Sequence, residues 1–165
     1  IILFAPFFAW LWLKLGKNDP AAPTKMALGL LLLGAGYLWI AYGVNDLQPG
    51  VKVSMIWLVL LYALHTSGEL CLSPIGLSLV NKLAPIKFAS LLMAIWFTAN
   101  AFGNKLAGSL SALYPEGGKV TNFMGYKMSN LYDFFMLFVF MSFIAALFLF
   151  LLTRKLQKMM QASNA

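Results

Sequence analysis

The sequence predicts an all-α membrane protein, and two observations lead to this prediction. Hydrophobic residues make up 61% of the 165 residues and charged residues only 10%, whereas ordinary soluble domains carry about 25% charged residues. The hydrophobic residues also form runs long enough to cross a bilayer, separated by short segments that contain proline, glycine and lysine. A soluble domain of this length could not bury so much apolar surface, so we expect lipid to surround most of the chain.

The apolar runs predict five passages across the membrane. They are expected over 1–13, 26–44, 53–83, 88–113 and 132–152, followed by a cytoplasmic tail over 153–165. The first run is shorter than the roughly 20 residues that a spanning helix needs, and it lacks the basic start and the cleavage site of a signal peptide. We therefore expect a truncated first helix, and a chain that forms the C-terminal transmembrane bundle of a longer protein.

Basic side chains are distributed unequally between the two sets of alternating loops. One set carries eight of them: Lys14, Lys17, Lys25, Lys82, Lys87, Arg154, Lys155 and Lys158. The other set carries three: Lys52, Lys119 and Lys127. Because cytoplasmic loops carry the excess of positive charge, we expect the C-terminus in the cytoplasm and the protein in a cell inner (plasma) membrane. Topology thus explains the net charge of +7, and no nucleic-acid partner is expected.

The second and last runs carry packing signals of opposite kinds. Gly29, Gly34 and Gly36 in the second run predict a close approach to a neighbouring helix. The last run is rich in phenylalanine and apolar on every face, which predicts a peripheral helix that contacts lipid.

The third run, over 53–83, is long enough for a tilted or broken helix and carries Glu69 near its middle. An ionised side chain at that depth costs about 2.5–3.5 kcal/mol on insertion scales. Such a residue is expected either to face a water-filled cavity as part of a functional site, or to be protonated and bonded to a neighbouring helix.

Other polar residues surround Glu69 at helical spacing. Residues four apart share a helix face, so His65, Glu69 and Ser73 are expected to form one polar stripe. Pro74 removes one backbone hydrogen bond, which predicts a kink or a locally opened helix. Broken helices near the middle of the membrane are typical of transporter binding sites, although a packing kink would give the same pattern.

The sequence allows several roles for His65. With Glu69 it could supply two metal ligands, but the chain has no other histidine, and no metal site or cofactor is expected. The remaining alternatives are a hydrogen-bonded or outward-facing side chain, or a proton relay. Cys71 is expected to be an inert buried thiol.

The fourth run, over 88–113, contains a stripe of small residues. Its members recur at every fourth position: Ala99, Gly103, Ala107 and Ser111. This spacing predicts close packing against another membrane helix. Trp96 lies one turn earlier, where it either packs between helices or lines a cavity. Lys105 either extends toward the membrane surface or acts as a buried ion pair or gate.

The chain closely resembles the proton-dependent oligopeptide transporter family of the major facilitator superfamily. The residues that carry this resemblance run Gly68-Glu69-Leu70-Cys71-Leu72-Ser73-Pro74-Ile75-Gly76-Leu77-Ser78, then Lys82-Leu83-Ala84-Pro85, Trp96-Phe97 and Gly103-Asn104-Lys105-Leu106-Ala107-Gly108. The resemblance implies core helices 8 (partial) to 12 of the superfamily bundle, with the first half of the same transporter missing. It also implies coupling to protons and a di- or tripeptide substrate whose amino terminus faces Glu69, with Ser73 and Trp96 in the cavity wall.

The resemblance assigns no role to His65 or Lys105, and three alternatives to peptide transport remain. A related carrier could move nitrate or another small organic solute. A membrane enzyme could use His65 and Glu69 as base and acid, although no nucleophile or metal set accompanies them, so enzymatic activity is not expected. A structural, non-transporting subunit could pack through the stripe from Ala99 to Ser111.

Overall fold

The structure is a computed structural model that describes residues 1–45, 53–115 and 120–163; for Leu83 and for 158–163 it describes the backbone alone. The helices are α1 (Phe4–Leu15), α2 (Ala22–Gly43), α3 (Met55–Leu83), α4 (Ala89–Ser111) and α5 (Leu131–Ser163), with short 3-10 turns at Gly16–Asn18 and Ile86–Phe88. Two strands, β1 (Thr121–Phe123) and β2 (Tyr126–Met128), precede α5. The predicted all-α class is confirmed, and helix α5 continues into the segment where a tail was expected.

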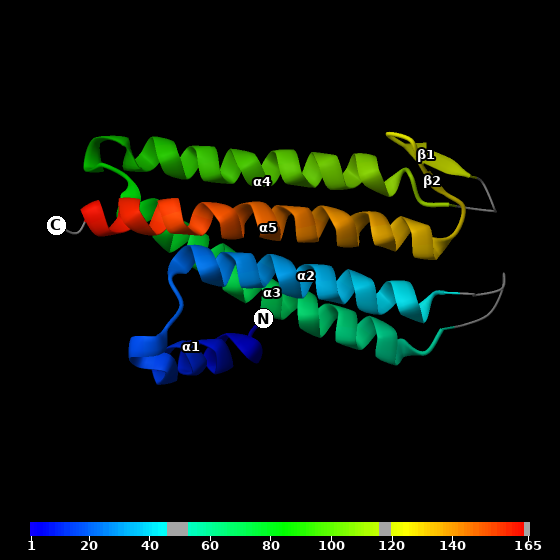
Figure 1. Cartoon of the computed structure of the whole chain (residues 1–165), viewed down its shortest axis with the longest axis horizontal. Coiled ribbons are helices and arrows are strands. Elements are labelled where there is room, and N and C mark those ends of the chain that lie inside the picture. The colour runs from blue at the N-terminus through cyan, green and yellow to red at the C-terminus, as the bar shows by residue number, and fades with distance from the viewer. Residues whose placement is uncertain (46–52, 116–119, 164–165) are drawn as a thin grey trace.

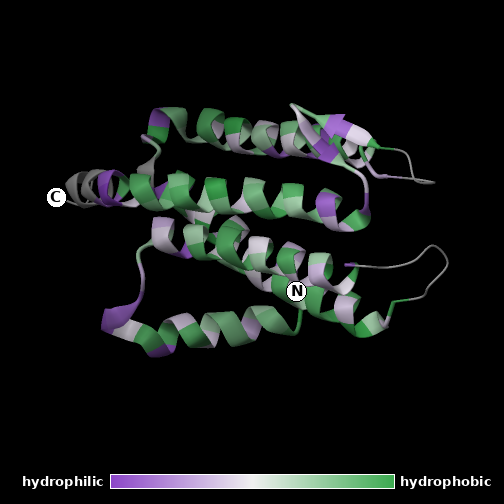
Figure 2. Cartoon of the chain, turned by 45° about the vertical axis from the view of Figure 1, so that its right-hand side comes forward, coloured by the Kyte–Doolittle hydropathy of each residue, from purple (hydrophilic) through white to green (hydrophobic). Residues whose placement is uncertain are grey.

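The helices lie side by side along one axis, with α2 between α3 and α5 (Figure 1). The turn from α1 to α2, the turn from α3 to α4 and the C-terminus all lie at one end of this bundle (Figure 1). The eight basic residues counted above lie in these turns or in the adjoining ends of the helices, so we call this end the basic end. Figure 2 shows that hydrophobic residues dominate the lengths of the helices.

Four helical segments are long and apolar enough to cross a membrane: Ala22–Gly43, Met55–Lys82, Ile86–Ser111 and Leu131–Gln157. Helix α1, with 12 residues, is shorter than these. Local sequence explains where two of the helices begin. Pro23 occupies the first turn of α2, where no intrahelical donor is needed, and the Ser54 hydroxyl accepts a hydrogen bond from the Ile56 amide at the start of α3.

Helix α2 packs closely against both of its neighbours through glycines, as the sequence predicts. A Cβ atom placed on Gly29 would lie 2.6 Å from the carbonyl oxygen of Gly68 in α3, and one placed on Gly68 would lie 2.7 Å from the carbonyl oxygen of Gly29. On the side of α5, a Cβ on Gly34 would lie 3.3 Å from atoms of Ser142 and Phe143. Only residues without a side chain allow the backbones of α2 and α3 to approach so closely.

A hairpin formed by β1 and β2 lies beside the ends of α4 and α5, at the end of the bundle opposite the basic end (Figure 1). The turn places Met124 and Gly125 at positive φ, and the Asn122 side chain accepts a hydrogen bond from the Gly125 amide. Met128 of this hairpin is fully buried in a cluster with Leu110 of α4 and with Phe134 and Leu137 of α5. The sequence predicts only a loop here, because the strands are too short to show an alternating pattern.

Candidate functional site

The candidate site lies on one face of α3. Glu69, Ser73 and Gly76 are four and three residues apart, so they share a face of the helix. The side chains of Glu69 and Ser73 are both exposed within this chain. A carboxylate and a hydroxyl on the same exposed face can bind a positively charged or hydrogen-bonding solute.

Trp96 brings an aromatic ring to the same face of α3. A Cβ atom placed on Gly76 would overlap the six-membered ring of the Trp96 indole, so the ring lies directly over this glycine. Trp96 also lines an apolar groove of about 340 Å³ between α3 and α4, and the other lining residues are Leu79, Val80, Leu92, Ile95 and Ala99. Trp96 thus packs between two helices, and its place in the wall of a substrate cavity stays a prediction.

His65 does not share the exposed surface of Glu69 and Ser73. Its ring contacts α2, edge-on to Tyr37 with ring centroids 4.6 Å apart and directly against Gly36. The buried Nε2 atom has no hydrogen-bond partner among the described residues, while the backbone of Leu33 interacts with the imidazole. The polar stripe expected from helical spacing therefore divides, because α2 covers one edge of it.

Helix α3 continues without interruption through Pro74. The locally opened helix that Pro74 predicts is therefore not observed. Proline leaves the backbone carbonyl of Leu70 without its intrahelical donor, and this carbonyl lies one residue from Glu69 along the chain. The helix is therefore continuous, but the backbone carbonyl of Leu70, next in sequence to Glu69, lacks its intrahelical hydrogen bond.

The small-residue stripe of α4 makes no close contact within the described residues. Every residue from Phe97 to Ser109 is exposed, and a Cβ atom placed on Gly103 would have nothing within 4 Å. Ser111 donates a hydrogen bond to the carbonyl oxygen of Gly108, 2.7 Å away. Close packing of Ala99, Gly103, Ala107 and Ser111 against another helix remains a prediction, and its partner would have to lie outside the described residues.

Lys105 is exposed on α4, whereas Lys25 is buried at the basic end. The Lys25 ammonium lies 2.6 Å from the Asp19 carboxylate and 4.5 Å from the centre of the Trp12 ring. This is the one ion pair within the part of the chain that the structure describes. The sequence analysis did not predict this ion pair, because it treated Lys25 only as a topology signal. The signal was the position of Asp19, six residues before Lys25 and separated from it by a turn that contains prolines.

The sequence profile of the POT family matches residues 1–130. The chain belongs to the POT family. Among its relatives, the di-/tripeptide transporter of Lactococcus lactis subsp. lactis is 39% identical over 121 residues, which are 73% of this chain and 24% of that protein. The peptide transporter YePEPT of Yersinia enterocolitica is 42% identical over 112 residues, which are 66% of this chain and 22% of that protein.

Solved structures of POT proteins have the same fold as this chain. A crystal structure of a mutant peptide transporter POT in complex with alafosfalin superposes with a TM-score of 0.80 at 37% identity, covering 96% of this chain and 30% of that one. A POT family transporter in complex with a thioalcohol-conjugated peptide gives a TM-score of 0.75 at 30% identity, covering 94% of this chain and 29% of that one. The chain spans about a quarter of the length of its curated relatives. These findings confirm the predicted family.

Proposed function

We propose that this POT-family chain is part of a proton-coupled symporter of di- and tripeptides that works by alternating access. The observation that carries the proposal is the exposed face of α3, where Glu69 and Ser73 lie on the same side as the Trp96 ring over Gly76. Di-/tripeptide transporters among its relatives support the choice of substrate. The remainder of the transporter would close the cavity from the opposite side, as in transporters built from two halves.

Each of the three residues has a distinct role in this proposal. The Glu69 carboxylate pairs with the ammonium group at the peptide's amino terminus, because a charge-assisted hydrogen bond in a low-dielectric cavity is strong. Ser73, one helical turn away, offers a hydroxyl to the peptide backbone. The indole of Trp96 supplies an apolar wall that accepts side chains of different shape. His65 is proposed to fix α3 against α2 rather than to relay protons, because its ring faces Tyr37 and Gly36.

The proposed setting is an inner membrane, with the basic end in the cytoplasm. This orientation follows from the excess of lysine and arginine at that end. No enzymatic activity is proposed, because the relatives of this chain are transporters.

The proposal is tested by uptake of labelled dialanine into proteoliposomes that contain the full-length protein. We expect accumulation only when an inward proton gradient is imposed, and we expect unlabelled dialanine to compete. A protein that accumulates neither dialanine nor another dipeptide, yet transports nitrate or another small solute, would refute the peptide assignment. A correctly inserted protein that transports none of these solutes would favour the structural-subunit alternative.

Trp96 is expected to control affinity for peptides with large apolar side chains. Replacing it by alanine should weaken binding of alanyl-phenylalanine about tenfold, because a favourable aromatic pair contributes up to about 1.5 kcal/mol. Binding of dialanine should change much less. Inhibition of dialanine uptake by each dipeptide measures both effects, and Trp96→Phe serves as the control because it keeps a ring over Gly76. Equal weakening of both dipeptides would assign Trp96 to helix packing alone.

A further inference from the structure

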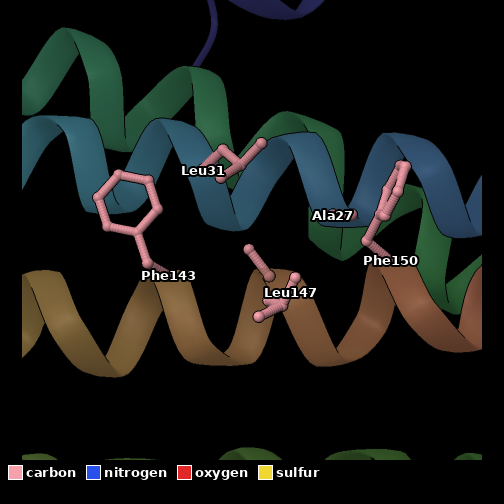
Figure 3. Close-up of a pocket in the computed structure, with 6 residues that line it drawn as sticks. Ala27, Leu31, Phe143, Leu147 and Phe150 are labelled. Atoms are coloured by element: carbon pink, nitrogen blue, oxygen red, sulfur yellow. The ribbon is translucent and has the colours of Figure 1, made fainter.

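An open groove of about 460 Å³ runs between α2 and α5, away from the candidate peptide site on α3 (Figure 3). Six apolar residues line it: Ala27, Leu31, Phe143, Ala146, Leu147 and Phe150. Figure 3 shows Phe143 and Phe150 extending from α5 toward α2, with Leu31 on α2 and Leu147 on α5 nearby. A lining of this kind accepts hydrocarbon and offers no hydrogen bond to a polar solute.

The groove has a narrow floor and large, accessible sides. Ala27 and Ala146, one from each helix, are almost completely buried. Leu31, Leu147 and Phe150 remain 41%, 60% and 60% exposed. Small residues below and large residues on both sides leave a channel along the two helices that a flexible hydrocarbon chain can follow.

A basic side chain continues the same face of α5 beyond the groove. Residues 143, 147 and 150 are spaced by four and three, and the next position on that face is Arg154. Arg154 is exposed and has no ion-pair partner among the described residues. On α2, Thr24 precedes Ala27 by three residues and so lies on the matching face.

Arg154 and Thr24, which continue the groove on α5 and α2, lie at the basic end of the bundle. Helix α2 begins there and the C-terminus of α5 lies there (Figure 1). The first residues of α2 have no side-chain cap, so the positive end of the helix dipole adds to the charge of Arg154. An apolar channel therefore leads to a positively charged end.

We propose that this groove binds an anionic phospholipid of the surrounding bilayer, with an acyl chain between α2 and α5 and the headgroup phosphate at Arg154. Charge complementarity selects this occupant, because a guanidinium binds phosphate through parallel hydrogen bonds. Basic pockets between membrane helices at the cytoplasmic side bind anionic headgroups in this way. A membrane helix in the groove would need small residues along its sides for close approach, and Leu31, Leu147 and Phe150 are large.

The test uses the full-length protein in nanodiscs of phosphatidylcholine with increasing fractions of phosphatidylglycerol. Retained lipids are counted by native mass spectrometry after release from the nanodisc. We expect selective retention of phosphatidylglycerol and about fivefold weaker retention in Arg154→Gln, the factor that one basic side chain near an anionic surface contributes. Leu147→Trp, which fills the groove, should weaken retention without changing the charge.

Two matched variants separate a defined site from general attraction. Lys155→Gln removes the same charge one position along α5, and Ile144→Trp adds the same bulk at an exposed position that does not line the groove. Both should retain phosphatidylglycerol as the unmodified protein does. Equal losses in Lys155→Gln and Arg154→Gln would overturn the proposal, as would equal retention of phosphatidylcholine. A photo-reactive residue placed at position 147 should cross-link to lipid, and its cross-linking to a protein segment would also overturn the proposal. None of these readouts depends on peptide transport.

Discussion

Replacing Glu69 by glutamine is expected to reduce gradient-driven uptake of dialanine about 10- to 100-fold. Glutamine keeps the size and the hydrogen-bonding carbonyl but removes the negative charge. A hydrogen bond to a charged group contributes about 1.5–3 kcal/mol, and each 1.4 kcal/mol corresponds to a factor of ten in affinity. Because Glu69 is exposed on α3 and has no ion-pair partner among the described residues, the substrate's ammonium group would lose its counter-charge.

Uptake into proteoliposomes that contain equal amounts of full-length protein measures this effect. Ser67→Ala is the matched control, because the Ser67 hydroxyl donates to the carbonyl oxygen of Ala63 in its own helix, 2.8 Å away. This variant should transport normally. If Glu69→Gln inserts normally and transports as well as the unmodified protein, Glu69 does not bind the substrate and the site must be sought elsewhere.

Replacing Gly29 by valine is expected to destabilise the bundle by about 1–3 kcal/mol, the usual cost of adding atoms to a closely packed site. The new Cβ would lie 2.6 Å from the carbonyl oxygen of Gly68, and the Cβ atoms of Cys71 and Leu72 lie 3.2 and 3.3 Å from the same position. Backbone and Cβ atoms cannot move aside by a change of rotamer, so α2 and α3 would have to separate. Gly68→Val should have a similar effect, because the contact is reciprocal.

Thermal unfolding of the full-length protein in detergent measures this loss. Gly108→Val is the matched control: it adds the same side chain to a helical glycine that has nothing within 4 Å. We expect a clear decrease in Tm for Gly29→Val and a much smaller change for Gly108→Val. Equal decreases would indicate that the effect reflects valine in a helix rather than the contact between α2 and α3.

The helices, and the placing of the basic connections at one end of the bundle, were predictable because hydrophobic length and loop charge are properties of the sequence alone. The close approach of α2 was also predictable, since Gly29, Gly34 and Gly36 offer no side chain to keep a neighbour away. Glu69 could be singled out because an acidic side chain in an apolar run is costly. Each of these signals resides in a single segment and needs no knowledge of its neighbours.

The sequence could not show which neighbour each face meets. Helical spacing placed His65 with Glu69 and Ser73, but the ring packs against α2, and this depends on the crossing at Gly29 and Gly68. The position of Trp96 over Gly76 joins residues of two helices, so no periodicity within either helix reveals it. The hairpin that ends in Met128 was missed because strands of three residues are too short for a pattern to stand out.

Helix α4 is held in two places with a long exposed stretch between them. Trp96 contacts α3 near the basic end, and Leu110 joins the buried cluster at the other end, whereas every residue from Phe97 to Ser109 is exposed. This stretch is about 20 Å of helix. Among the described residues, α4 is therefore held only toward its two ends, and its middle offers an open face of small residues to a helix that would have to lie outside them.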